Sequence, residues 1–327
     1  MRRLLALSLL LAAGPALAQR PLDARLTDYA YPFPTQTLAF SEQGEALELA
    51  YMDVRPDAPN GRTVVLLHGK NFSGAYWERT ARHLAARGFR VVMPDQVGFG
   101  KSSKPTDFQY SFHAMAGHTR RLLDTLGVER AAVVGHSMGG MLATRFALSF
   151  PERTERLALV NPIGLEDWQR AVPYLSVDGW TEQQLAQTPA DVKAYMQQAY
   201  FGDEWEADYD PLLEIQQGWI LGPHHATTAR VSALTYDMIF TQPVVHAFPD
   251  LAVPTLLVIG QRDRTALRRA AASPAAQDTL GHYPTLGRRA AAAIPDARLV
   301  ELDGVGHVPP FEAFGRYIEP LTAFLEE

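Results

Sequence analysis

Short apolar runs alternate with amphipathic stretches along most of this 327-residue chain. An unbroken apolar run is typical of a buried strand, whereas apolar residues at every third or fourth position indicate a helix. The runs that read as strands lie at residues 36–41, 47–54, 63–69, 89–95, 130–137, 156–162, 254–263 and 297–307. The stretches that read as helices lie at residues 77–87, 113–127, 140–150, near 286–293 and 311–326. Strands that alternate with helices predict an α/β fold, with a mostly parallel central sheet and helices on both faces.

The alternation stops between residues 164 and 241. This stretch contains no buried-strand run, only helix-compatible segments broken by glycine and proline, and it holds four of the five tryptophans. We therefore predict a helical cap at 164–241, inserted into one core domain that is made of residues 19–163 and 242–327.

The first eighteen residues differ from the rest. Two arginines precede an apolar run from Leu4 to Ala13, and an Ala-Leu-Ala ending closes the segment at Ala18. This layout is typical of a secretory signal peptide (1–18) that is cleaved after Ala18, and the apolar run is too short to span a bilayer. We therefore expect a periplasmic or secreted protein with no stable membrane anchor after cleavage.

Composition and charge limit which stabilising bonds, partners and cofactors we expect. The chain has no cysteine, so no disulfide can stabilise it, and its stability must come from the size of its apolar core. The net charge is −6 and no block of like charges occurs, which argues against a nucleic-acid partner. Metal-ligand spacings such as H-E-x-x-H are absent, so we expect neither a metal nor a cofactor. The sequence does not indicate an oligomeric state.

Polar residues that could carry chemistry follow the apolar runs. They are the His68-Gly69 pair, Ser137 within GHSMG, Asp263 and His307. The carboxyl ends of parallel strands share one edge of a sheet, where ligands bind. Serine needs a base to become a nucleophile, His307 can accept its proton, and Asp263 can orient the imidazole. A serine between glycines can also cap the helix that follows it, so Ser137 alone leaves both interpretations open.

Other acids and histidines compete for these roles. Asp250 and Asp296 precede strands and therefore fall at the wrong edge of the sheet, while Asp303 is expected to shape the turn before His307. The alternatives to His307 are His68, His136, His224, His225 and His282. The first two precede glycines, and we expect them to form hydrogen bonds with the loop backbone.

The order serine, aspartate, histidine, each after a strand and preceded by an early His-Gly pair, resembles the α/β-hydrolase fold family from about residue 36 to residue 325. The resemblance implies that Gly135 and Gly139 allow a sharp turn that raises the Ser137 hydroxyl above the sheet. It also implies an oxyanion hole made by the backbone amides of Met138 and Lys70, whose side chains would be free to vary.

A second loop also resembles the family. MPDQVGFGKSS, at residues 93–103, is similar to a loop in which the aspartate and serine, here Asp95 and Ser102, are structural.

A serine nucleophile indicates acyl transfer through an acyl-enzyme, whereas dehalogenases and epoxide hydrolases of this fold carry aspartate at that turn. Iminopeptidase-like relatives usually have a glycine-proline-rich oxyanion loop and a tryptophan beside the serine, and HGKNFSG and GHSMGG lack both. We therefore predict an esterase for small-molecule esters with small to medium apolar groups. The alternatives are an iminopeptidase-like, amide or lactone hydrolase, and a receptor-type member that binds a ligand with negligible turnover.

The aromatic side chains of the predicted cap are candidates for binding the substrate. The four tryptophans are Trp168, Trp180, Trp205 and Trp219. We expect them to line an apolar substrate pocket, although some must form the core of the cap itself.

Overall fold

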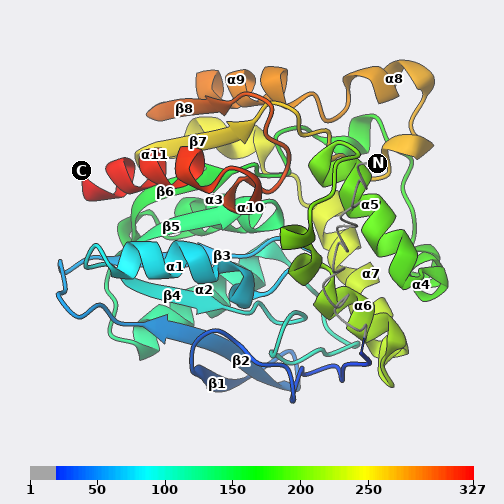
Figure 1. Ribbon diagram of the computed structural model, residues 1–327, viewed down its shortest axis with the longest axis horizontal. Helices are drawn as coiled ribbons and strands as arrows, with labels where there is room; N and C mark the ends of the chain where they lie inside the picture. Colours follow the sequence, from blue (N-terminus) through cyan, green and yellow to red (C-terminus); the bar gives the residue numbers. More distant parts are fainter. Residues whose placement is uncertain (1–19) are drawn as a thin grey trace, which may run out of the picture.

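Eight strands form one sheet in the computed structural model, which describes residues 20–327 (Figure 1). Their order across the sheet is β1-β2-β4-β3-β5-β6-β7-β8. The bounds are Thr35–Glu42 (β1), Glu45–Val54 (β2), Thr63–Leu67 (β3), Arg90–Pro94 (β4), Ala131–His136 (β5), Thr154–Val160 (β6), Thr255–Gly260 (β7) and Ala297–Leu302 (β8). β4, β3 and β5 to β8 run parallel, while β1 and β2 are antiparallel to their neighbours. The predicted fold class is confirmed, and the predicted signal peptide lies outside the described residues.

The apolar strands are buried because both faces of the sheet are covered. Successive side chains of a strand point to opposite faces, and in β3 Val64 and Leu66 pack into one core while Val65 and Leu67 pack into the other. This arrangement explains why the strands read as continuous apolar runs and do not alternate with polar residues.

Helices cover the two faces of the sheet and one of its edges (Figure 1). Their bounds are Glu78–Ala85 (α1), Phe112–Thr125 (α2), Met138–Ser149 (α3), Val177–Ala186 (α4), Pro189–Phe201 (α5), Glu214–Leu221 (α6), His225–Thr241 (α7), Pro274–Thr279 (α8), Tyr283–Ala293 (α9), Pro309–Glu312 (α10) and Phe314–Glu326 (α11). α1 and α11 contribute to one apolar core, and α2, α3 and α9 to the other. No helix among residues 20–327 is long and apolar enough to cross a membrane.

Helix boundaries differ from the sequence expectation in three places. The first predicted helix begins as a 3-10 turn, Gly74–Trp77, because the Ser73 side chain caps that turn before α1 starts. The last predicted helix is divided into α10 and α11, since Ala313 has a φ of −146° and interrupts the helical backbone. The short helix α8 follows a Ser-Pro start and was not predicted.

The segment between β6 and β7 carries α4, α5, α6 and α7 beside the edge where the parallel strands end (Figure 1). α7 ends at Thr241, the residue at which the predicted cap ends. Part of the apolar surface of this segment packs in a small core, to which α5 contributes Val192, Met196 and Phe201 and the loops after β3 and β8 contribute Phe72 and Val308. Buried apolar residues of α7 join one of the two large cores. The division into core and cap stays a prediction, and the helices lie where that prediction places them.

Candidate active site

A sharp turn between β5 and α3 carries Ser137. This residue has a φ of 56° and a ψ of −122°, a combination that is sparsely populated for residues other than glycine. A Cβ at Gly135 would collide with the backbone of Gly139, and a Cβ at Gly139 would collide with the carbonyl of Leu67. Both glycines are therefore required by close backbone packing. The Ser137 side chain forms no capping bond to α3, so the capping interpretation is wrong.

The Ser137 hydroxyl meets a buried histidine and a buried aspartate. His307 Nε2 lies 2.9 Å from Ser137 Oγ, and His307 Nδ1 lies 2.6 Å from Asp263 Oδ2. All three side chains are buried, and they follow β5, β7 and β8. A neutral imidazole with its proton on Nδ1 donates to the carboxylate and leaves Nε2 free to accept the serine proton. The structure therefore brings together the three residues that the sequence proposed as a triad.

Two further donors hold the aspartate. Asn161 Nδ2 donates to Asp263 Oδ2 over 2.8 Å, and the amide of Thr265 donates to Oδ1 over 2.8 Å. Asn161 Oδ1 accepts in turn from the amide of Gly260, at the end of β7, over 2.9 Å. Sequence reasoning missed Asn161, although it directly follows a buried strand as Ser137 does, and that position was the available signal.

The main chain around His307 is anchored on both sides. Its amide donates to the carbonyl of Tyr200 over 2.9 Å, and its carbonyl lies 2.8 Å from His136 Nε2. Tyr200 belongs to α5, and its ring packs against the imidazole with the two centroids 4.5 Å apart. The helical segment between β6 and β7 therefore helps to position the histidine.

Two of the competing histidines, His68 and His136, bond to backbone groups. His68 Nε2 accepts from the amide of Gln96 over 3.0 Å, and His68 Nδ1 lies 2.9 Å from the carbonyl of Gly69. Burial lowers the pKa of both His68 and His136, so neither is a charged group at neutral pH.

The competing acids lie away from the histidine. Asp250, Asp296 and Asp303 are exposed, whereas Asp263 is buried against His307.

The loop at 93–103 has a structural role. Asp95 accepts from the amides of Gly74 and Lys101 over 2.6 Å and 2.7 Å. The Ser102 hydroxyl donates to the Asp95 carbonyl over 2.6 Å. These bonds tie the loop after β4 to the loop after β3, and neither side chain reaches Ser137.

Two backbone amides beside Ser137 are unoccupied. Among the described residues, the amides of Lys70 and Met138 donate to no protein acceptor. Met138 is the first residue of α3, where helical amides lack a partner. Gly69 brings the Lys70 loop against the serine, because a Cβ added at Gly69 would lie 3.1 Å from the Ser137 Cβ. This arrangement suits the predicted oxyanion hole, which needs free amides next to the nucleophile.

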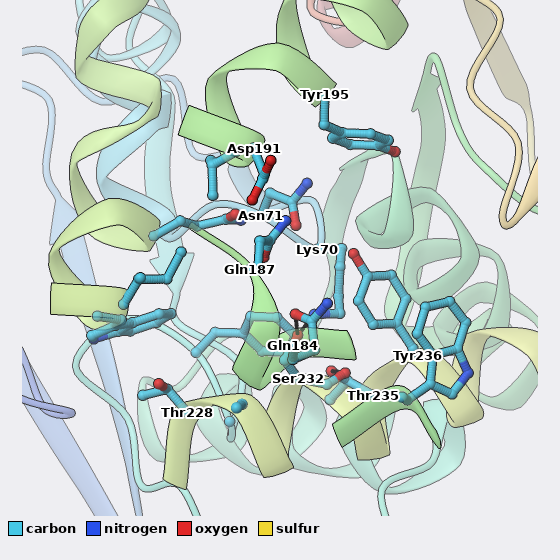
Figure 2. A pocket seen from close by; sticks show the side chains of 18 of the residues that line it. Lys70, Asn71, Gln184, Gln187, Asp191, Tyr195, Thr228, Ser232, Thr235 and Tyr236 are labelled. Atoms are coloured by element: carbon cyan, nitrogen blue, oxygen red, sulfur yellow. Dashed lines mark hydrogen bonds between the residues drawn. The ribbon is translucent and has the colours of Figure 1, made fainter. Parts of the chain in front are cut away.

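Two adjoining cavities lie between the strand ends and the helical segment. The inner cavity, about 30 Å³ in volume, is lined by Ser137, and the outer cavity is about 370 Å³ (Figure 2). Residues that line both cavities form the neck between them: Lys70, Asn71, Tyr195, Tyr236 and Leu267. The inner cavity holds about one water molecule, so most of a substrate would occupy the outer cavity.

The four tryptophans separate into three environments. Trp168 lines the inner cavity, while Trp180 and Trp219 line the outer cavity. Trp205 lies elsewhere: it packs edge-on against Phe201 and Tyr209 in the core of the helical segment. The expectation that Trp205 lines the pocket is therefore wrong, because the helical segment uses this ring to fill its own interior.

The side chain of Lys70 is the second feature that sequence reasoning missed. Its ammonium group projects from the loop after β3 toward α7 and lies between the labelled residues Ser232 and Tyr236 (Figure 2). The oxyanion role of its amide leaves this side chain free to vary, and in the structure the side chain lines both cavities. Among residues 20–327 no group of three or more His, Asp or Glu side chains is placed to bind a metal ion.

Comparison with known proteins gives matches over most of the chain. The family model described as "alpha/beta hydrolase fold" matches residues 62–314. A crystal structure of a "probable hydrolytic enzyme" from Pseudomonas aeruginosa PAO1 is 47% identical, with a TM-score of 0.93, and the match covers 94% of this chain and 99% of that one.

Curated relatives are more distant. Lipase 1 of Psychrobacter immobilis is 26% identical over 86% of this chain and 83% of its own length. The 2-hydroxy-6-oxo-6-phenylhexa-2,4-dienoate hydrolase of Burkholderia cepacia is 38% identical, but over only 33% of this chain and 39% of that protein.

Proposed function

The chain belongs to the α/β hydrolase fold family, and on that premise we propose that it is a serine hydrolase of carboxylic esters. The observation that carries the proposal is the unbroken chain of hydrogen bonds from Ser137 through His307 to Asp263. The outer cavity of about 370 Å³ is in the range of small-molecule sites, and its lining includes the rings of Phe99, Trp180, Tyr195, Trp219 and Tyr236. These features favour esters with small to medium apolar groups.

The mechanism follows from the positions of the atoms. Ser137 Oγ attacks the ester carbonyl while His307 Nε2 takes its proton. Asp263 holds the imidazole by Nδ1 and stabilises the imidazolium that forms. The oxyanion is held by the amides of Lys70 and Met138. The imidazolium then protonates the leaving alcohol, and an acyl group remains on Ser137.

Water completes the cycle. His307 removes a proton from a water molecule, and the hydroxide attacks the acyl carbonyl. The second oxyanion then collapses: the bond to Ser137 Oγ breaks, the His307 imidazolium returns its proton to Oγ, and the acid is released. The small volume of the inner cavity, about 30 Å³, limits how many water molecules can lie beside Ser137 at one time.

Hydrolysis of 4-nitrophenyl butyrate tests the proposal. The wild-type protein should release 4-nitrophenol, and Ser137→Ala should lower kcat by about 10⁴-fold or more, because the nucleophile is lost. A receptor-type member would bind ligands but give no Ser137-dependent turnover. Comparison of kcat/KM for esters, amides and lactones of matched structure distinguishes an esterase from an amide or lactone hydrolase, since the preferred substrate class has the highest kcat/KM.

A further inference from the structure

Lys70 carries two groups to the site from one residue. Its amide lies beside Ser137, while its side chain extends into the outer cavity (Figure 2). There Nζ donates to Ser232 Oγ over 2.9 Å and lies 4.1 Å from the centre of the Tyr236 ring. The other face of Tyr236 is stacked on Trp180, with the centroids 4.4 Å apart. The ammonium is therefore held against one wall of the cavity, within reach of a substrate that enters the neck.

The Lys70 ammonium has no acidic partner among the described residues. An ammonium has three N–H donors, and the bond to Ser232 uses one of them. The nearby cation–π contact with Tyr236 compensates only part of the lost hydration. Removal from bulk water lowers the pKa of the Lys70 ammonium to about 7, which is the expected cost of a cation with no anion beside it.

The other charged or titratable side chains of the same cavity do not neutralise it. They are Asp191, Tyr195, His225, Tyr236 and Arg268. The Asp191 carboxylate is exposed, and its Oδ2 accepts from the amide and the hydroxyl of Thr188 and not from Lys70. Arg268 adds a second cation, which lies over the ring of Trp180 at 5.8 Å. The outer cavity thus carries two cations, Lys70 and Arg268, against one carboxylate, Asp191.

We infer that the substrate carries a carboxylate group, and that Lys70 binds this group in the outer cavity while Ser137 attacks the ester. The inference rests on the proposed function and names its substrate class. A single ammonium with two free N–H donors matches the charge and the two oxygens of a carboxylate. Lys70 is then a specificity residue, and the ester that it selects is a monoanion.

Matched pairs of esters test this inference. 4-Nitrophenyl hydrogen adipate and 4-nitrophenyl hexanoate have acyl chains of equal length, and only the first ends in a carboxylate. 4-Carboxyphenyl butyrate and 4-methylphenyl butyrate place the same difference on the alcohol side. The wild-type protein should favour the anionic member of at least one pair in kcat/KM.

The variant Lys70→Met keeps the backbone amide and removes the charge. The ratio of kcat/KM for the anionic ester to that for the neutral ester should fall about 10- to 100-fold, the range expected for one charge-assisted hydrogen bond. Use of the ratio cancels any general loss of activity in the variant. Lys193→Met removes a cation from α5 that pairs with Asp210, outside the cavity, and should leave the ratio unchanged.

The pH dependence of the wild-type protein supplies a second measurement, which does not depend on the folding of Lys70→Met. The preference of the wild-type protein for the anionic ester should decline as the pH rises through about 7, because the ammonium loses its proton. In Lys70→Arg the preference should stay level to pH 9, since a guanidinium remains charged.

Two results would overturn the inference. One is hydrolysis of neutral esters with no preference for the anionic member of either pair. The other is a preference that survives in Lys70→Met. Failure of every ester, together with absence of labelling of Ser137 by a fluorophosphonate, would instead refute the proposed function itself.

Discussion

At the scale of single residues, the strained backbone conformation of Ser137 places its hydroxyl opposite His307. A non-glycine residue with this φ and ψ costs about 1–3 kcal/mol, and such a conformation persists only where the surroundings enforce it. Here the close packing of Gly135 and Gly139 enforces it. As a result the Ser137 hydroxyl lies within hydrogen-bond distance of His307 Nε2.

Replacement of the acid distinguishes Asp263 from Asp303. Asp263→Asn should lower kcat by about 10²- to 10⁴-fold, because the amide favours the wrong imidazole tautomer and cannot stabilise the imidazolium. Asp303→Asn is the matched control, and since Asp303 is exposed its kcat should stay near that of the wild type. Steady-state kinetics on 4-nitrophenyl butyrate measure both. A large loss in Asp303→Asn with little loss in Asp263→Asn would move the acid to Asp303.

The residues of the triad could be predicted because each follows an apolar run, and such runs are visible in the sequence. The roles of Asn161 and Lys70 could not be predicted in the same way. Lys70 meets Ser232 across 162 positions of sequence, and no local pattern predicts which helix lies against its loop. Asn161 follows a strand as expected of a site residue, but its function depends on the Asp263 oxygen that it meets.

At the scale of elements, the helical segment between β6 and β7 is part of the site. α5 contributes Tyr200, which packs on the His307 ring, and α7 contributes Ser232 and Tyr236, which hold the Lys70 side chain. The strands could be predicted from continuous apolar runs and the major helices from their periodicity, because both patterns are local in the sequence. The break at Ala313 and the assignment of tryptophans to cavity or core depend on tertiary packing.

Alanine substitutions at two tryptophans test this division of the segment. Trp180→Ala should raise KM for aromatic esters about 3- to 10-fold, the scale of one aromatic stack, because it removes the ring that supports Tyr236. Trp205→Ala should instead lower the Tm by several degrees through lost packing, with kcat/KM within about twofold of the wild type. Kinetics and thermal unfolding of both variants show which tryptophan contributes to substrate binding and which to stability. A change in KM at Trp205 with none at Trp180 would contradict the assignment.

At the scale of the whole molecule, the two apolar cores on either side of the sheet bury histidines whose ordinary pKa is near neutral. His68 and His136 are fully buried, and burial lowers the pKa of each below its ordinary value. The unfolded chain therefore binds more protons than the folded chain below about pH 6.5. The contribution to stability is complete above that pH and is lost as the pH falls.

This linkage predicts a lower Tm at pH 5.5 than at pH 7.5. Differential scanning calorimetry at both pH values measures the difference, and His68→Gln should reduce it because one buried imidazole is removed. Burial raises the pKa of Glu166 and of Glu312, so these two carboxylates act in the opposite direction to the histidines. An equal or higher Tm at pH 5.5 would show that the buried histidines do not govern the acid side of stability.

The most direct test of Ser137 as the nucleophile is the mass of the protein after reaction with a fluorophosphonate, followed by peptide mapping of the modified site. We expect one phosphonyl adduct on the peptide that contains Ser137, and no adduct in Ser137→Ala, because Ser137 has a histidine nitrogen 2.9 Å from its hydroxyl and free amides beside it. An unmodified wild-type protein, or an adduct on a different residue, would contradict it.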